Sequence, residues 1–147
     1  MKSLKEFISK NRDKTKVADL ELADLSNSNL QGVSLEGANL KGAILKRANL
    51  RKANLKGADL RYAYLFEACL EDANFQDADL GEASISYANL RNADFRGANL
   101  KMADLTCSDL RGANFEGADL RGAYLYKANL EETILTKKTN KSKKIRR

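Results

Sequence analysis

A large apolar residue recurs at every fifth position from Leu20 to Leu135, twenty-four times in succession. Most of these centres are Leu, and the others are Phe75, Ile85, Phe95 and Phe115. Ala usually stands two residues before each centre, with Asp or Asn between them. The positions that depart from Ala are Ser28, Val33, Ser108 and Thr133. The chain is therefore one array of the repeat A-(D/N)-L-X-X.

A period of five excludes both an α-helix and a straight β-strand as the unit of this array. On a helix, five residues advance about 500°, so successive centres would spiral around every side. In a straight strand, side chains five residues apart point to opposite faces. Each repeat must therefore contain a corner. We expect the Ala and the centre to point inward, the residue between them to point outward, and the last two residues to make the turn.

The repeat resembles that of the pentapeptide-repeat family over residues 18–137. The resemblance implies an all-β solenoid: a right-handed quadrilateral β-helix of about six coils, with four repeats per coil and Leu20 under Leu40 and Leu60. At a sheet-like spacing of about 4.8 Å, the column would be roughly 29 Å tall. We number the faces by their first centres, which are Leu20 for face one, Leu25 for face two, Leu30 for face three and Leu35 for face four.

The residues at the last repeat position agree with corners. Eight of the nine glycines occupy it, and a type II turn needs a positive φ there. Arg47, Tyr62, Tyr87 and Met102 occupy the same position. Because a positive φ strains such residues, we expect type I-like turns at those four corners. The chain has no Pro, which suits a fold whose backbone N–H groups bond to the next coil.

The chain divides into an N-terminal capping helix and linker at 1–17, the β-helix at 18–137 and a basic tail at 138–147. Ser3 and Glu6 have the spacing of a capping box, and Leu4, Phe7 and Ile8 form an apolar stripe. These residues predict a short helix over residues 3–11 that covers the first coil. The tail is polar and basic, so we expect it to be disordered.

The net charge of +6 comes from the two ends. Residues 1–17 carry +4, residues 138–147 carry +6, and the repeat body carries −4. A basic tail can attract nucleic acid or an acidic partner, and it can equally serve only to solubilise the protein. This tail lacks interleaved aromatic residues for base stacking, so nucleic-acid binding is not expected.

The sequence predicts no catalytic or metal site. There is no His, which removes the usual general base and any Ser-His or Cys-His nucleophile. Cys69 and Cys107 fall about two coils apart, too far for a disulfide or a zinc site, which indicates a reducing, cytoplasmic compartment. Asp and Asn recur as solvated outward ladders without a cleft. We expect no enzyme, cofactor or small-molecule substrate, and no membrane span.

One face departs from the polar pattern and is the candidate interaction surface. Its residues, on face two or at its corners, are Ile44, Tyr62, Tyr64, Phe66, Tyr87, Tyr124 and Tyr126. Exposed aromatic clusters often mark a contact surface, although an aromatic ladder can also simply pack between coils. Asp104, Thr106 and Cys107 interrupt the stripe, so the middle patch of Ile44, Tyr64, Phe66 and Tyr87 is the stronger candidate. The sequence thus predicts a rigid protein–protein interaction or regulatory module of unknown partner.

The resemblance also implies an alternative, because some pentapeptide-repeat proteins mimic DNA, bind DNA gyrase and confer quinolone resistance. Such mimicry needs a strongly acidic surface, whereas here Lys41, Arg61, Lys101 and Arg121 form a basic ladder beside the acidic one on face one. Those family members dimerise through a C-terminal module. Since no cap is evident at the C-terminal end of this column, a homodimer through the sixth coil, Leu120 to Leu135, is possible.

Overall fold

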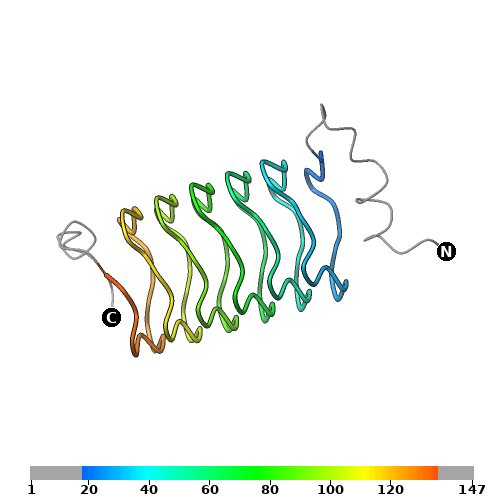
Figure 1. Cartoon of the computed structure of the whole chain (residues 1–147). Coiled ribbons are helices and arrows are strands. Elements are labelled where there is room, and N and C mark those ends of the chain that lie inside the picture. The colour runs from blue at the N-terminus through cyan, green and yellow to red at the C-terminus, as the bar shows by residue number, and fades with distance from the viewer. Residues whose placement is uncertain (1–17, 136–147) are drawn as a thin grey trace.

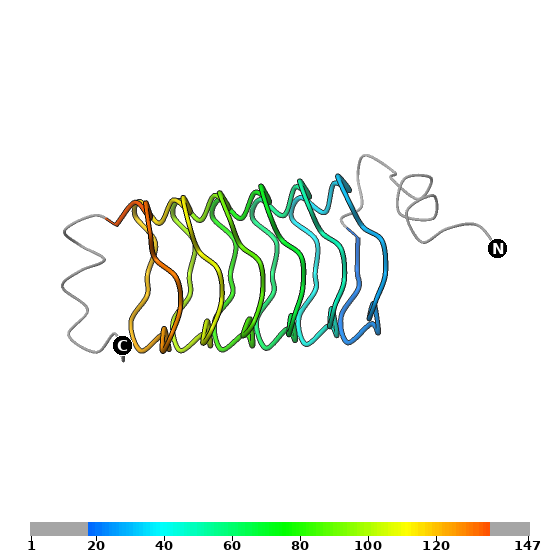
Figure 2. The ribbon, with the colours of Figure 1, turned by 90° about the horizontal axis from the view of Figure 1, so that it is seen from below.

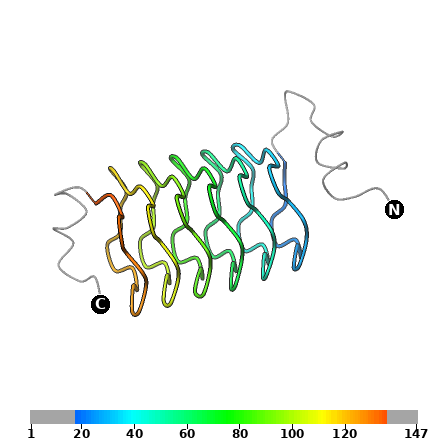
Figure 3. The ribbon, with the colours of Figure 1, turned by 60° about the horizontal axis from the view of Figure 1, so that its bottom comes forward.

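The computed structural model describes residues 18–135, which form a column of stacked coils (Figure 1). Each residue that precedes a centre forms a parallel bridge with the residue twenty positions later, from Asp19 with Asn39 to Asn114 with Ile134. A turn occurs in every repeat of five, so one coil holds four repeats. Figure 2 and Figure 3 show the coils in register, with the first and last described residues at opposite ends of the column. The predicted solenoid β-helix is confirmed.

The β-structure consists of single-residue parallel bridges, and the described part of the chain contains no helix and no longer strand. The extended part of each repeat spans only the Ala, the outward residue and the centre before the chain turns. Longer strands cannot form between corners this closely spaced. The helix expected over residues 3–11 and the tail at 138–147 lie outside the described residues.

Backbone hydrogen bonds join every coil to its neighbours. The N–H of Leu40 donates to the carbonyl of Asp59 in the next coil at 2.7 Å, and the N–H of Asn39 donates to the carbonyl of Ala18 in the preceding coil at 2.9 Å. The same pattern repeats around all four faces. Since the backbone groups of the faces are used along the column axis, a Pro would remove one of these donors.

The core is the inside of the column. Centres and their alanines are buried through the middle coils, while Leu20, Leu130 and Leu135 at the two ends of the described column are only partly buried. Inside face four, the rings of Phe75, Phe95 and Phe115 stack with centroids 4.8 and 4.7 Å apart. Burial of each centre contributes roughly 1.5–3 kcal/mol to the free energy of folding. The centres together form one continuous core along the column.

The corners differ from expectation. Every described corner has a positive φ at the last repeat position, including Arg47 at 56°, Tyr62 at 61°, Tyr87 at 59° and Met102 at 59°. The prediction of type I-like turns at these residues is wrong. The Tyr62 N–H donates to the Gly81 carbonyl at 3.1 Å. This bond to the next coil requires the same corner geometry as a glycine, and it offsets a cost of about 1 kcal/mol for the left-handed conformation.

Residues 18–135 contain no helix that is long and apolar enough to cross a membrane. The same residues contain no group of three or more His, Cys, Asp or Glu side chains placed to hold a metal ion.

Candidate functional site

Exposed apolar side chains gather on one side of the column. Seven of the eight large hydrophobic residues that are exposed among the described residues lie on face two or at one of its two corners. They are Leu22, Ile44, Tyr62, Tyr64, Tyr87, Met102 and Tyr126. Phe66 and Tyr124 are half-buried on the same face. We call these nine residues the face-two surface. The eighth exposed residue, Ile134, lies on face four.

The outward row of face two mixes large apolar and short polar side chains along the column. Parallel bridges connect Ile44 to Tyr64, Tyr64 to Ser84, Ser84 to Asp104, and Asp104 to Tyr124. Large apolar rungs therefore stand on the second, third and sixth coils, and short polar rungs separate Tyr64 from Tyr124. The middle patch predicted from sequence and the second pair of tyrosines lie on one face but not in one continuous cluster.

The middle patch is a packed aromatic cluster. The rings of Tyr64 and Phe66 stack with centroids 6.2 Å apart and planes 13° apart, and Tyr87 from the next coil is tilted over Phe66 at 5.5 Å. The Lys46 Nζ lies 5.7 Å from the centroid of the Phe66 ring. Phe66 is thus the anchor of the patch, while Tyr64 and Tyr87 remain exposed to solvent.

An inserted hydroxyl shapes the corner that carries Tyr87. Elsewhere in the described column the N–H after the corner donates to the centre's carbonyl, as Ala83 does to Leu80 at 3.1 Å. At the Tyr87 corner this bond is absent among the described hydrogen bonds. Instead the Ser108 hydroxyl donates to the Ile85 carbonyl at 2.7 Å, and the Ala88 N–H donates to Ser108 Oγ at 3.2 Å. The buried Ser108 therefore opens this corner beneath Tyr87.

Tyr87 also contacts the following coil through its hydroxyl. A side-chain hydrogen bond with Cys107 is the main cause that raises the pKa of Tyr87 above its ordinary value, and the nearby Asp104 adds to it. The phenol consequently stays protonated at neutral pH and can act as a hydrogen-bond donor. Cys107 and Cys69 are both free thiols and half-buried.

Four aspartates of the acidic ladders are paired within their own repeats. In four repeats an Asp before the centre is bound by an Arg after it, with Nη2 to Oδ2 distances of 2.6 Å. The pairs are Asp59 with Arg61, Asp94 with Arg96, Asp109 with Arg111, and Asp119 with Arg121. Mainly through these hydrogen bonds, the pKa of Asp94 and that of Asp119 fall to about 2.

The basic ladder of face one also forms ion pairs between neighbouring coils. Lys101 lies 3.4 Å from Asp119, and Lys41 lies 4.0 Å from Glu21. Arg61 also approaches Asp79, with 3.9 Å between Nε and Oδ2. Face one therefore presents alternating, matched charges and no continuous row of uncompensated carboxylates.

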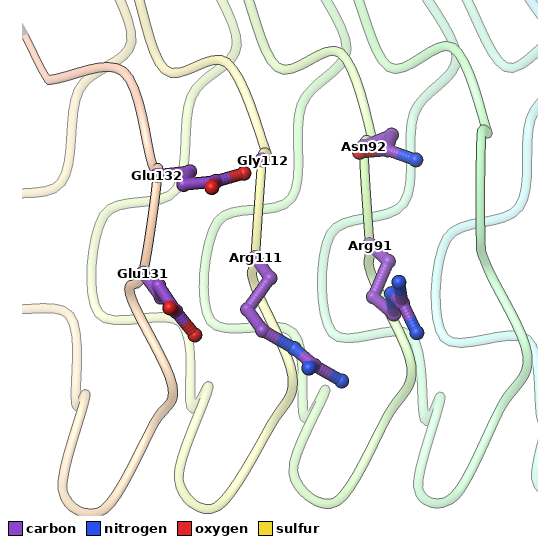
Figure 4. Close-up of a pocket in the computed structure, with 6 residues that line it drawn as sticks. All are labelled: Arg91, Asn92, Arg111, Gly112, Glu131 and Glu132. Carbon is purple, nitrogen blue, oxygen red and sulfur yellow. The ribbon is translucent and has the colours of Figure 1, made fainter.

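A polar hollow on face three is a feature that sequence reasoning did not anticipate. Figure 4 shows its residues in two rows across the last three coils: Arg91, Arg111 and Glu131, and beside them Asn92, Gly112 and Glu132. The hollow exists partly because Gly112 has no side chain there, since a Cβ would overlap the Asn92 Oδ1. Its charges are mixed and Arg111 is already bound to Asp109, so it offers no selective site for an anion or a cation.

Three residues of the site were missed by the argument from sequence. Leu22 and Met102 belong to the exposed apolar surface, and a signal for them exists in the sequence, since both occupy the same corner column as Tyr62. Ser108 was noted only as a departure from Ala. Its role depends on the position of single atoms and has no signal in the repeat pattern.

The comparisons with known proteins agree with the repeat architecture. A family model described as pentapeptide repeats matches residues 18–57, 34–72, 73–112 and 103–136. The crystal structure of a pentapeptide repeat protein, Rfr23, from the cyanobacterium Cyanothece 51142 is 30% identical, with a TM-score of 0.75 over 77% of this chain and 91% of that one. A search of curated proteins gives no match.

Two further solved structures are similar over most of this chain. HetL, a pentapeptide repeat protein involved in heterocyst differentiation regulation from the cyanobacterium Nostoc sp. strain PCC 7120, is 32% identical over 82% of this chain and 67% of that one, with a TM-score of 0.45. QnrB1, a plasmid-mediated fluoroquinolone resistance protein, is 18% identical over 80% of this chain and 81% of that one, with a TM-score of 0.45. At these TM-scores neither relative informs the function of this chain.

Proposed function

Because the chain belongs to the pentapeptide-repeat family, we propose that it is a non-catalytic, right-handed quadrilateral β-helix that binds a partner protein through the face-two surface. The location of the exposed apolar side chains carries this proposal. Seven of the eight large ones among the described residues lie on face two or its corners. Exposed apolar residues scattered at random would be divided among all four faces. Their concentration on one side is typical of an interaction surface.

The rigidity of the column supports the same role. Face two is held by backbone hydrogen bonds between coils, such as Tyr64 N–H to the Ala43 carbonyl at 2.9 Å. Its aromatic side chains are therefore presented in fixed positions, which lowers the entropic cost of binding a partner. We propose a reducing compartment for the protein, since its two cysteines are unpaired.

Capture of a partner from a lysate of the native host tests this function. We expect the intact protein to retain a partner that the variant Tyr64→Ser, Phe66→Ser, Tyr87→Ser does not retain, because it loses the anchor of the patch and both exposed rings. A matched triple variant on face four, Glu36→Ser, Lys56→Ser, Ile134→Ser, should retain it. Equal retention by all three proteins would overturn the proposal.

Mimicry of DNA is the alternative function, and the charge arrangement speaks against it. A DNA mimic needs rows of exposed, uncompensated carboxylates, whereas four of the aspartates here bind an arginine of their own repeat. We therefore expect no inhibition of gyrase supercoiling at micromolar protein. Inhibition that is lost on reversing the charge of Asp59, Asp79 and Asp119, and indifferent to the aromatic variant, would establish mimicry instead.

We also propose that the last coil can pair with a second copy of the chain. Leu120, Leu125 and Leu130 stand in the last coil among residues 18–135, so one side of that coil has no described coil beside it. A two-fold contact between two such ends would pair their backbone N–H and carbonyl groups. Repulsion between the basic tails opposes the contact, so salt should favour it. Light scattering at high protein and salt concentration would contradict a dimer if it shows only the monomer mass.

A further inference from the structure

A ridge of apolar side chains runs along the corner between face one and face two. The large residues of this corner stand on alternate coils, with Leu22 73%, Tyr62 54% and Met102 50% exposed. The residues between them in the same column are Gly42, Glu82 and Gly122. The side chains of Leu22 and Met102 lie over Gly42 and Gly122, where no Cβ would fit without displacing them. The corner ridge, Leu22, Tyr62 and Met102, therefore repeats every second coil.

The repeat distance of the corner ridge selects among the conformations of a bound chain. Coils joined by parallel bridges are about 4.8 Å apart, so ridge residues repeat about every 9.6 Å. A polyproline II helix presents one side every three residues, or about 9.3 Å. An α-helix presents one side about every 10.5 Å, after seven residues. An extended strand presents one side about every 6.6–6.8 Å. Only the polyproline II repeat stays in phase with three ridge residues.

The backbone of this side of the column favours the same conformation. The N–H of Tyr62 is bonded to the Gly81 carbonyl and that of Tyr64 to the Ala43 carbonyl, so no free edge is offered to an added strand. A polyproline II segment makes no backbone ladder, and its carbonyls remain free to accept hydrogen bonds. The hydroxyls of Tyr62 and Tyr64 can donate to such carbonyls while their rings pack against proline.

The narrowness of face two favours a linear partner over a broad, flat one. Face two is about 29 Å tall, and the extended part of a repeat makes it about 10 Å wide, so it offers about 300 Å². A stable interface between globular proteins buries about 800 Å² per partner. A second copy laid face to face would fall well short of that area. A linear segment, in contrast, needs only a narrow strip.

The charge of the surface agrees with an uncharged segment. The acidic residues of face two and its two corners are Asp24, Glu67, Glu82 and Asp104, and the basic ones are Lys46, Arg47 and Lys127. The net charge of this surface is therefore only −1, and Arg47 is bound to Glu67. A neutral apolar segment is therefore the charge-matched ligand, and a strongly basic or acidic one is not.

We infer that the corner ridge and the adjoining rings of face two bind a proline-rich segment of the partner protein, in the polyproline II conformation and running along the column. This inference rests on the proposed function and adds the chemistry of the partner. Proline rings pack between Tyr62 and Met102 and against Tyr64, and the tyrosine hydroxyls hold the carbonyls of the segment.

Fluorescence anisotropy with labelled decaproline tests the inference directly. Decaproline is about 31 Å long, close to the height of the column. We expect saturable binding, weakened at least fivefold in the variant Tyr62→Ser, Met102→Ser and within twofold of the intact protein in Ile134→Ser, which removes an equally exposed apolar residue from face four. A labelled Gly-Ser decapeptide should show no binding. Absence of decaproline binding at millimolar protein would overturn the inference.

A variant with a different ridge spacing distinguishes recognition of the two-coil period from nonspecific apolar binding. Glu82→Tyr places a ring between Tyr62 and Met102, at a corner whose φ of 57° matches that of Tyr62 and Tyr87. The substitution adds apolar area but breaks the two-coil period, so we expect decaproline binding to fall at least fivefold. Unchanged or tighter binding would contradict the inference. Melting curves establish that the variant is folded.

Mapping by NMR on the intact protein makes the test independent of any variant. We expect decaproline to shift the Met102 methyl and the Tyr62 and Tyr64 rings, and to leave Ile134 unchanged. Shifts confined to other faces would overturn the inference. If decaproline fails to bind while partner capture still depends on Tyr64, Phe66 and Tyr87, the inference fails and the proposed function stands. If capture also fails to depend on them, both fail.

Discussion

Face one and face two share one backbone and one repeat, yet they present opposite surfaces. On face one, every outward residue before a centre is Asp or Asn, and the charges are paired with one another, as in the ion pair of Asp59 with Arg61. On face two, three of the six residues at the same position are large and apolar, Ile44, Tyr64 and Tyr124, and their side chains remain partly exposed. Since identical coils fold with either surface, the aromatic residues are not needed to make a coil. The difference supports our proposal that they serve contact with another molecule.

The largest expected effect comes from placing a charged side chain on the inside of face two. Leu65→Asp should destabilise the protein by at least about 4 kcal/mol and unfold the middle of the column, because an unpaired carboxylate replaces a buried centre. Urea denaturation measures the loss. The control is Ser84→Asp, an outward change on the same face, which should stay within about 0.5 kcal/mol. Similar losses in both variants would refute the assignment of inward and outward positions.

Removing the inserted hydroxyl tests how the Tyr87 corner differs from the other corners. Ser108→Ala should cost about 1–2 kcal/mol, because the Ile85 carbonyl and the Ala88 N–H both lose a partner. The chemical shifts of the Tyr87 ring should change as well. Ser28→Ala is the matched control, since its hydroxyl bonds only within its own turn, to the Leu25 carbonyl. Equal losses of stability in the two variants would contradict a special role for Ser108.

Acid should weaken the charged faces before it affects face two. The carboxyls of Asp94 and Asp119 have a pKa of about 2 in the folded protein, below the ordinary value of 3.8, so they contribute stability above pH 4 that is lost as pH falls toward 2. After allowance for solvent, each contributes about 0.5–1 kcal/mol. We expect the denaturation midpoint to fall over this range, and less steeply in Asp94→Asn, Asp119→Asn. Asp104→Asn is the control. If the midpoint falls with pH as steeply in Asp94→Asn, Asp119→Asn as in this control, the two carboxyls do not have this role.

The smallest expected effect lies on face one itself. Asp59→Asn should change the melting temperature by no more than a degree or two, within about 0.5 kcal/mol. The amide oxygen can still accept the Arg61 N–H, which the Asp59 carboxylate accepts at 3.1 Å, and only an exposed ion pair is lost. A loss above 1 kcal/mol would mean that the ladders of face one hold the coils together more than we propose.

The spacing of the centres was sufficient to predict a corner in every repeat, because a period of five fits neither a helix nor a straight strand, and the resemblance to the pentapeptide-repeat family predicted the solenoid. The corners at Tyr62 and Tyr87 were predicted wrongly, since local preference at a single residue was weighed without the bonds that each coil makes to the next. Of the exposed apolar residues, the tyrosines could be placed by counting repeats. Leu22 and Met102 could have been placed the same way if the corner column had been read along the axis. The bridge through Ser108 could not, because it depends on distances that no pattern of letters contains.

The stability of a variant that lacks three exposed rings tests the central claim most directly, because an aromatic ladder that only packs between coils would also produce this surface. Tyr62→Ser, Tyr64→Ser, Tyr87→Ser removes side chains that are all exposed in the structure. If these rings serve contact with a partner, urea denaturation should show a loss of about 1 kcal/mol or less. A loss of about 3 kcal/mol or more, as expected if each ring contributes a stabilising cross-coil pair, would contradict the account.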